Sequence, residues 1–421
     1  MGGRHSRSKY KRASRRRKRR FLRWRSLLLV PALLVVLLGV SLVGAAVSPG
    51  NVSFEAKWAD WLRAHHAGLI AQKFEEVYFS AVAPAKGGTP KGLNQIPVSV
   101  QVAPSTTDPQ QAVSTTQPGP STTRPATTTT TVPPGLPPPK PVPLVVHPSL
   151  AGEGKWQPTG PLVDGVPAMY VAQFRADDIY TSQITSAVWI DTKLLRVELV
   201  PGSTEPGGTW AHPPFVTPAE LAYLVAAFNG GFRFDDARGG IYLEGRWGVP
   251  AVQGAASLVI YKDGQVNIGD WGTDVAMSAA VAAVLQNVVL LVDNGQLAPS
   301  ATYTDNAIWG YTLGGGYVVP RSGIGVTADG ALVYVAGPAL TARSLAESLQ
   351  RAGAVRAMTL DINPEWVTFN FYSHVAGHPR EVSGTKLYPE MQRSADRYLP
   401  FVPEARDFFE VLLPGSPPAS G

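Results

Sequence analysis

The pattern of apolar and polar positions divides the chain into zones that differ in kind. An uncharged apolar run covers residues 26–47, and an amphipathic stretch follows at 53–80. Residues 103–146 are poor in apolar residues, and from 147 onward short apolar runs alternate with Gly, Asp and Asn. Short runs bounded by such turn residues are typical of strands and hairpins. The pattern therefore predicts one sheet-rich globular domain behind an apolar amino-terminal segment.

The globular zone contains several strand-like runs and two helix signals. Asp-Gly and Asn-Gly turns at 263–264, 294–295 and 329–330 predict hairpins. Thr217, Pro218 and Glu220 form a helix-start pattern, so a helix is expected at 217–227, and a second capped helix at 341–352. Strands are expected at 168–174, 187–191, 194–200, 240–243, 257–261, 288–292, 322–326, 332–335 and 357–360. This mixture predicts an α+β class, with a mixed, hairpin-rich sheet domain and a few packed helices.

The apolar run that ends at Phe228 is followed by Asn229, Gly230 and Gly231. Adjacent glycines permit positive φ and close approach to another group, and exposed amide groups in such a turn suit an anion. The alternative is an ordinary tight turn with Asn in the left-handed region.

The net charge of +6 comes from the amino terminus. Residues 1–25 hold 13 Lys and Arg and no acid, so 24 basic residues face 31 acidic ones in the remainder, a net charge of −7. A basic leader before an apolar run is a membrane-topology signal, and the acidic body does not suit nucleic acid. The chain has no Cys, which excludes disulfides and Cys nucleophiles.

The apolar run 26–47 is long enough to cross a bilayer. We expect an uncleaved signal anchor with residues 1–25 cytoplasmic and the rest outside the cell membrane; a cleaved signal peptide is the alternative. Residues 48–102 are expected to form a membrane-proximal helical segment, and Trp58 and Trp61 are placed for the interface. Residues 103–146 predict a disordered Pro/Thr-rich linker that acts as a stalk, and 416–421 a disordered tail.

Four segments within 147–415 appear in the order found in the phosphodiester glycosidase family. The segments are AAFNGGF at 226–232, SLVIYKDGQVN at 257–267, RSGIGVTADG at 321–330 and SLAESLQRAGAVRAMTLD at 344–361. The domain therefore resembles that family, which includes N-acetylglucosamine-1-phosphodiester α-N-acetylglucosaminidase and bacterial exopolysaccharide-associated proteins. One departure follows Asp361. The family continues as LDGGGS, whereas this chain reads Ile362, Asn363, Pro364 and Glu365.

The candidate chemistry follows from residue types as well as from the resemblance. The planar fork of Arg321 suits phosphate, and Asn229 with the Gly230 and Gly231 amides suits sugar or phosphate oxygens. Asp361 is a candidate general acid or base, and Glu365 a candidate second carboxylate. The structural alternatives are an Arg321 ion pair, an Asp361 turn cap and a solvated Glu365.

We therefore expect a membrane-anchored extracytoplasmic hydrolase that cleaves sugar-1-phosphodiesters of envelope glycan or exopolysaccharide. The alternatives are a catalytically degenerate glycan-binding or scaffold protein, and an assembly factor that acts through residues 53–80. No cofactor is required by the pattern, although the acidic pairs at 177–178 and 235–236 are candidate Ca²⁺ ligands or surface turns. The expected partners are the membrane and a polysaccharide or sugar phosphate.

Overall fold

The computed structural model describes residues 35–47, 84–96, 101–102, 135–303, 308–310 and 318–417, with scattered residues between 54 and 70. The chain forms two units, Met1–Glu75 and Glu76–Gly421. In the first unit residues 35–47 are helical, and the Trp58 indole Nε1 donates a hydrogen bond to Ser41 Oγ at 3.0 Å.

The predicted membrane span falls only partly within the described residues, since 26–34 lie outside them. Among the helices that the structure describes, none combines the length and apolar character needed to span a bilayer.

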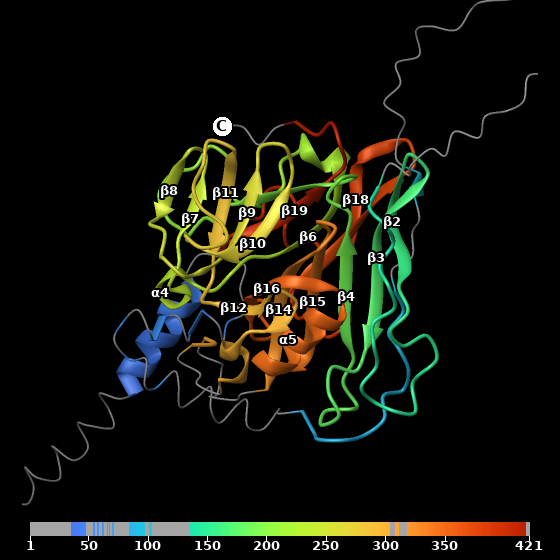
Figure 1. Cartoon of the computed structure of the whole chain (residues 1–421). Coiled ribbons are helices and arrows are strands. Elements are labelled where there is room, and N and C mark those ends of the chain that lie inside the picture. Colours follow the sequence, from blue (N-terminus) through green and yellow to red (C-terminus); the bar gives the residue numbers. More distant parts are fainter. Residues whose placement is uncertain are drawn as a thin grey trace, which may run out of the picture. The chain divides into compact units, whose positions relative to one another are not determined.

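The second unit is built mainly from three β-sheets (Figure 1). The nine-stranded sheet has the order β1 (Gln101–Val102), β2 (Gln157–Val163), β3 (Val166–Phe174), β4 (Thr185–Ile190), β15 (Leu332–Leu340), β14 (Val319–Thr327), β16 (Ala354–Ile362), β12 (Leu290–Asp293) and β13 (Gln296–Leu297). The second sheet has the order β10 (Val266–Asp270), β9 (Ala256–Tyr261), β11 (Val281–Gln286), β7 (Ile241–Leu243) and β8 (Arg246–Val249). The third has the order β18 (His378–Lys386), β17 (Phe369–Val375), β6 (Leu224–Asn229), β19 (Phe408–Leu412) and β5 (Arg196–Val200).

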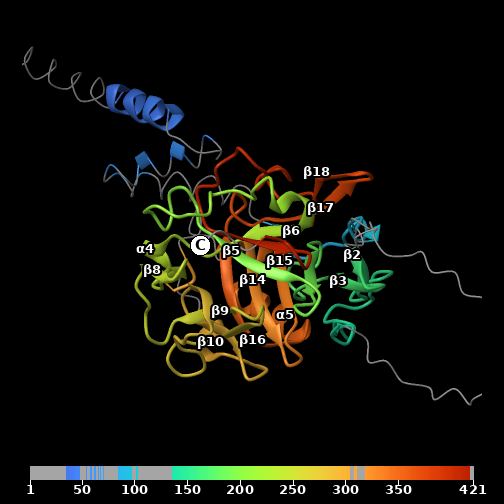
Figure 2. The same ribbon diagram turned by 90° about the horizontal axis from the view of Figure 1, so that it is seen from above.

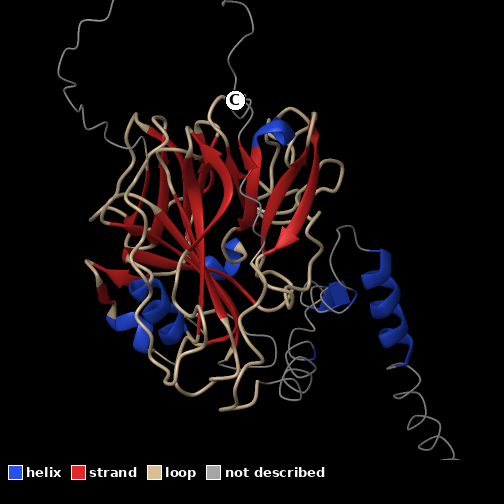
Figure 3. Cartoon of the chain, turned by 90° about the vertical axis from the view of Figure 1, so that its right-hand side faces the viewer, coloured by secondary structure: helices blue, strands red, loops and turns tan. Residues whose placement is uncertain are grey.

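The described helices of this unit are short. They are η1 (Glu220–Tyr223), α4 (Phe234–Ala237), η2 (Pro299–Thr302) and α5 (Ala342–Arg351). The domain is thus mostly β-sheet with few helices, as Figure 3 shows by the predominance of strands. The expected hairpin-rich sheet domain is confirmed at this level.

The hydrophobic core lies on both faces of the nine-stranded sheet. On one face Leu345 and Leu349 of α5 pack with Trp309 in a buried cluster. On the other face the sheet shares a second cluster with strands of both five-stranded sheets. In Figure 2, β9 and β10 lie on the opposite side of β14 and β16 from α5. The ring centre of Phe228 in β6 lies 5.2 Å from the ring centre of Tyr334 in β15 and 5.5 Å from that of Phe369 in β17. These aromatic contacts fix β6 against the central sheet.

The turn and capping signals predicted several elements correctly. The hairpins β9–β10, β12–β13 and β14–β15 are antiparallel pairs at the expected places. Helix α5 begins after Thr341, whose Oγ1 accepts from the Ser344 backbone N–H at 2.9 Å while Ser344 Oγ accepts from the Thr341 N–H. This reciprocal cap satisfies two amide groups at the helix start.

The helix predicted at 217–227 is wrong. Only one 3-10 turn, η1, forms there, and the chain then continues as strand β6. All six residues of β6 are buried, because the strand is hydrogen-bonded between β17 and β19 and covered on both faces. A continuous apolar run of this length is compatible with a buried strand or a buried helix, and the strand contacts decide the outcome here.

The predicted linker 103–146 requires a correction at its carboxyl end. Residues 135–146 pack on the domain: Leu136 and Val142 are buried, and the Leu136 N–H donates to Asp191 Oδ2 at 2.6 Å. Ahead of the linker, Thr181 Oγ1 donates to the Gly88 carbonyl at 2.6 Å and β1 pairs with β2. The described residues on both sides of 103–134 therefore contact the same unit, whereas 103–134 themselves lie outside the described residues.

Candidate active site

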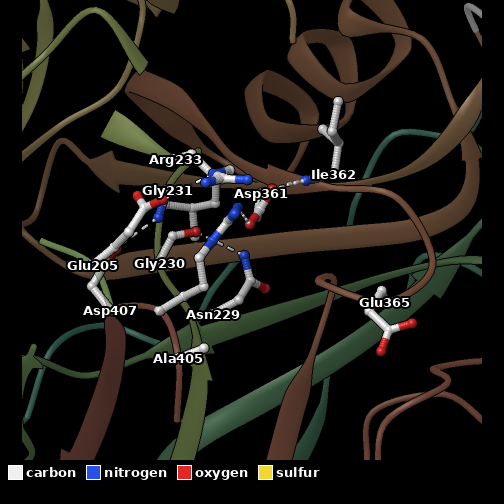
Figure 4. Close-up of polar contacts among 12 residues, drawn as sticks. Glu205, Asn229, Gly230, Gly231, Arg233, Asp361, Ile362, Glu365, Ala405 and Asp407 are labelled. Carbon is white, nitrogen blue, oxygen red and sulfur yellow. Dashed lines mark hydrogen bonds and ion pairs between the residues drawn. The ribbon is translucent and has the colours of Figure 1, made fainter. Parts of the chain in front are cut away.

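The Gly230–Gly231 turn follows directly after β6 and is fastened to two neighbouring segments. The Gly230 N–H donates to the Asp407 carbonyl at 3.1 Å, and the Gly230 carbonyl accepts from the Asp361 N–H at 3.0 Å. Asp361 lies near the end of β16, and Asp407 directly precedes β19. The turn thus brings together strand ends that are distant in the sequence (Figure 4).

The glycines are required by close contact rather than by backbone conformation, since neither has positive φ. A Cβ at Gly230 would lie 1.9 Å from Asp407 Oδ2, far inside van der Waals contact. A Cβ at Gly231 would lie 3.3 Å from the side-chain Cγ of Asn287, which is tight but less severe. The turn therefore does not use the positive φ that glycine permits, but it does use the close approach.

Asp361 presents a buried carboxylate beside this turn. Its Oδ2 forms an ion pair with Arg406 Nη2, and its Oδ1 accepts from the Ile362 N–H at 2.8 Å. Burial raises the pKa of Asp361 to about 6, although the Arg406 charge opposes the shift. Asp361 therefore exchanges a proton near neutral pH, which an exposed Asp does not do.

Asp407 is a second buried carboxyl on the same turn, with only 2% of the residue exposed. Its Oδ2 accepts from the Gly231 N–H at 3.2 Å, and its Oδ1 has no hydrogen-bond partner among the described residues. Burial raises the pKa of Asp407 to about 7; the Arg406 charge lowers it, and the charges of Glu205 and Asp361 raise it. The turn is thus bordered by two carboxyl groups that titrate near neutral pH.

Arg406 is the cation shared by both carboxyl groups. Its guanidinium carbon also lies 4.4 Å from the centre of the half-buried Trp366 ring, a cation–π distance. Arg397 and Arg393 lie against the same ring at 5.5 and 5.6 Å. Positive charge therefore accumulates on the Trp366 side of Asp361.

Asn229 organises the end of β6, and both polar atoms of its side chain form hydrogen bonds. Its Nδ2 donates to the Gly230 carbonyl at 2.9 Å and to Ser322 Oγ at 3.0 Å. Its Oδ1 accepts from Tyr334 Oη at 3.0 Å and from the Thr368 N–H at 3.1 Å. The structure places Asn229 beside the turn, as expected, with its polar atoms engaged in holding three strands together.

Arg321 lies on the opposite side of β16 from the Asp361 carboxylate. It is the register partner of Ile362, so the two side chains share a face, and the Asp361 side chain points to the other face. The Arg321 Nε donates to the Leu340 carbonyl at 3.1 Å, and Nη1 donates to the Trp309 carbonyl at 3.2 Å. The structure does not bring Arg321 together with Asp361.

Glu365 is also apart from the Asp361 group, as Figure 4 shows. Its carboxylate lies 3.1 Å from Arg393 Nε, and its backbone carbonyl accepts from Arg397. The loop that carries it departs from the family pattern in residue type but retains one glycine-like feature. Asn363 has φ of 74°, in the left-handed region that glycine adopts at least cost.

The acidic pairs considered as Ca²⁺ ligands have local roles in the structure. Asp177 Oδ1 accepts from the N–H groups of Ile179 and Tyr180, which closes a turn. Asp235 and Asp236 lie in the first turn of α4, where negative charge is favourable.

Comparison with known families supports the resemblance carried by the motifs. The phosphodiester glycosidase family model matches residues 222–361. This segment is phosphodiester glycosidase-like. The match includes β6 and the Gly-Gly turn and ends at Asp361, whereas Arg406 and Asp407 lie outside it. A search of curated proteins gave no match.

Two solved structures illustrate the range of structural likeness. The zebrafish N-acetylglucosamine-1-phosphodiester α-N-acetylglucosaminidase catalytic domain, auto-inhibited by its pro-peptide, is 17% identical; the likeness covers 60% of this chain and 85% of that one with a TM-score of 0.38. A hypothetical protein from Synechocystis is 13% identical, with 61% and 64% covered and a TM-score of 0.35. Likenesses of this strength do not bear on the site.

The phosphodiester glycosidase-like domain therefore has polar site residues that sequence reasoning missed. Arg406 and Asp407 stand before the apolar run of β19, and their one sequence signal is a charged pair at a strand start. Asn287 is a third, since its side chain lies against Gly231 and its buried Oδ1 has no hydrogen-bond partner among the described residues. Two ionisable carboxyl groups, one guanidinium and an amide around a glycine turn suit proton transfer next to a bound anion.

Proposed function

We propose that the protein hydrolyses sugar-1-phosphodiester bonds at the Gly230–Gly231 turn. The observation that supports this most strongly is the pair Asp361 and Asp407, two buried carboxyl groups with raised pKa values beside one arginine. Glycoside hydrolysis commonly uses two carboxyl groups whose protonation states differ. The match of residues 222–361 to phosphodiester glycosidases supports the same reaction class.

In this proposal the two carboxyl groups take different roles. Asp361 has the lower pKa and is paired with Arg406, so it is ionised at neutral pH and activates water or attacks the anomeric carbon. Asp407 retains its proton to about pH 7 and donates it to the departing phosphate oxygen. Arg406 binds the phosphate, because a guanidinium donates two parallel hydrogen bonds to such oxygens. Phosphate is a good leaving group, so the base contributes more than the acid.

We further propose that the enzyme acts outside the cytoplasm on envelope glycan or exopolysaccharide. The uncharged run 26–47 behind 13 basic residues supports a single-pass anchor with a cytoplasmic amino terminus. The acidic remainder of the chain argues against nucleic acid as a partner.

The test uses the full chain in detergent with a panel of synthetic sugar-1-phosphodiesters, and the released reducing sugar is measured. We expect turnover by the wild type and a loss of about 10² to 10⁴-fold in kcat for Asp361→Asn, the range for a missing acid–base group. Asp407→Asn is expected to cause a smaller loss in kcat, because phosphate is a good leaving group and needs little protonation. Asp329→Asn, on an exposed turn, is the matched control and should retain wild-type rates. Wild-type turnover by both site variants would disprove the site.

A catalytically degenerate glycan-binding protein is the second candidate. It is favoured by the loop after Asp361, where Ile362, Asn363 and Pro364 replace three family glycines and remove a backbone donor at Pro364. In that case the wild type should bind members of the panel in calorimetry and release no sugar from any of them.

A further inference from the structure

A second group of ionisable side chains lies away from the Gly230–Gly231 turn, at the outer edge of the third sheet. It consists of Glu198 on β5, Glu410 on β19, Glu220 at the start of η1, and His212 in the preceding loop. His212, Glu220 and Glu410 are all buried. These four residues have no role in the proposed hydrolysis.

The histidine is oriented with one nitrogen toward the carboxyl groups. Its Nδ1 lies 2.7 Å from the Pro213 carbonyl, an acceptor, so Nδ1 carries a hydrogen and donates it. In the neutral ring Nε2 therefore has the lone pair. Nε2 lies 3.1 Å from Glu220 Oε1 and 3.9 Å from Glu410 Oε1. A histidine fixed in this way, by a backbone carbonyl on its other nitrogen, is the usual arrangement of a metal ligand.

More carboxyl groups lie close together here than the described cations beside them can neutralise. Glu410 and Glu198 are direct register partners across β19 and β5, where like charges repel. Glu410 is fully buried, and neither of its carboxyl oxygens has a hydrogen-bond partner among the described residues. A buried carboxyl with two unsatisfied oxygens indicates that a ligand belongs there.

Two neighbouring contacts define how the cluster is held. Glu220 Oε2 accepts from the Thr217 N–H at 2.7 Å, which leaves Oε1 directed at His212. Glu198 Oε1 pairs with Arg196 Nε at 2.5 Å, while Glu198 Oε2 has no hydrogen-bond partner among the described residues. Glu220 thus presents Oε1 to His212 Nε2, and Glu198 presents an oxygen with no hydrogen-bond partner among the described residues.

We propose that His212, Glu220 and Glu410 bind a divalent transition-metal ion of the zinc class, with Glu198 beside them as a further oxygen donor. One imidazole with carboxylates is a zinc-type donor set. Zn–N and Zn–O bonds of about 2.0–2.2 Å at tetrahedral angles place ligand atoms roughly 3.4 Å apart. The separations of 3.1 and 3.9 Å from Nε2 bracket that value, and all three ligand atoms lie within 4.8 Å of one another.

The cluster also has an access route. Glu198 and His212 line a pocket of about 530 Å³ whose other walls include Tyr242, Ile260 and Lys262. His212 and Glu198 thus connect the buried cluster to this pocket. The pocket and the cluster are both formed within the second unit.

The test is zinc binding by chelator-treated full chain in detergent, measured by calorimetry and by the shift of the melting temperature. We expect one Zn²⁺ per chain and a melting temperature that rises with zinc concentration, because a ligand specific for the folded state stabilises it. His212→Gln and Glu410→Gln should each weaken zinc binding at least about 100-fold. The matched controls are His378→Gln and Glu381→Gln, which alter an exposed His–Glu pair with side chains 64% and 67% exposed.

Glu410→Gln keeps the side-chain shape and removes one of the facing carboxyl groups. We therefore expect the metal-free variant to melt at or above the temperature of the metal-free wild type, which separates loss of the ligand from loss of the fold. Absence of zinc binding by the wild type would overturn the proposal. Wild-type zinc affinity in both His212→Gln and Glu410→Gln would overturn it equally.

Discussion

The buried carboxyl of Asp407 makes the stability of the domain depend on pH in a specific way. Its folded-state pKa is about 7, against 3.8 for an ordinary Asp. Between those values the unfolded chain releases a proton that the folded chain retains, so stability falls as pH rises from about 4 to 7 and then levels off. A difference of about three pKa units at about 1.4 kcal/mol each gives roughly 4 kcal/mol.

Asp407→Asn removes this dependence and preserves an oxygen that can accept from the Gly231 N–H. At pH 4 the protonated acid and the amide are nearly equivalent, so the variant and the wild type should have similar unfolding free energies. By pH 8 the variant should be more stable than the wild type, by at most about 4 kcal/mol.

The assay is urea unfolding of wild type and variant, followed by Trp fluorescence at pH 4, 5, 6, 7 and 8. The informative quantity is the difference in unfolding free energy between the two proteins. Asp361 and Glu410 make the stability of both proteins fall with rising pH, so their contribution cancels in this difference. Asp329→Asn serves as the exposed control and should differ from wild type by a constant amount. A difference between wild type and Asp407→Asn that does not change with pH would refute the reasoning.

Three further predictions concern the same turn. The rate of sugar release should follow a bell-shaped pH profile, with an acid limb near pH 6 from Asp361 and a basic limb near pH 7 from Asp407; a flat profile between pH 5 and 8 would contradict these roles. Arg406→Gln should move the acid limb to higher pH, since the Arg406 charge lowers the pKa of Asp361, and an unmoved limb would show that the ion pair is not formed in solution. Gly230→Ala should lower the unfolding free energy by about 1–3 kcal/mol through overpacking against Asp407, and Gly231→Ala by less, as urea titrations will show; equal effects would contradict the contact distances.

Local signals in the sequence predicted the parts of the fold that depend on a few adjacent residues. Asp-Gly turns predicted hairpins, and the Thr341 cap predicted α5, because the physical cause lies within four residues. The helix prediction for the run that forms β6 failed, because apolar residues in this order suit a helix and a buried strand equally. Its pairing with β17 and β19, about 140 and 180 positions along the chain, decides the outcome.

The residues of the candidate site also fall into two groups, those that local sequence signals indicated and those that only long-range strand pairing brings together. Gly230, Gly231 and Asp361 stood out because each ends an apolar run. Asp407 reaches Gly231 across 176 positions, and only the β19–β6 register places it there. Arg321 was favoured for its chemistry, but strand alternation directs its side chain to the face opposite Asp361. Residue type therefore indicated candidate chemistry, and long-range pairing selected the residues that stand together.

The attachment of both flanks of residues 103–134 to one domain has a consequence for proteolysis. Thr181 contacts Gly88 ahead of this segment, and Asp191 contacts Leu136 behind it. A protease that cuts once between 103 and 134 would therefore yield two polypeptides that stay associated and migrate together in gel filtration. Denaturation would then be needed to separate the amino-terminal fragment from the rest of the domain.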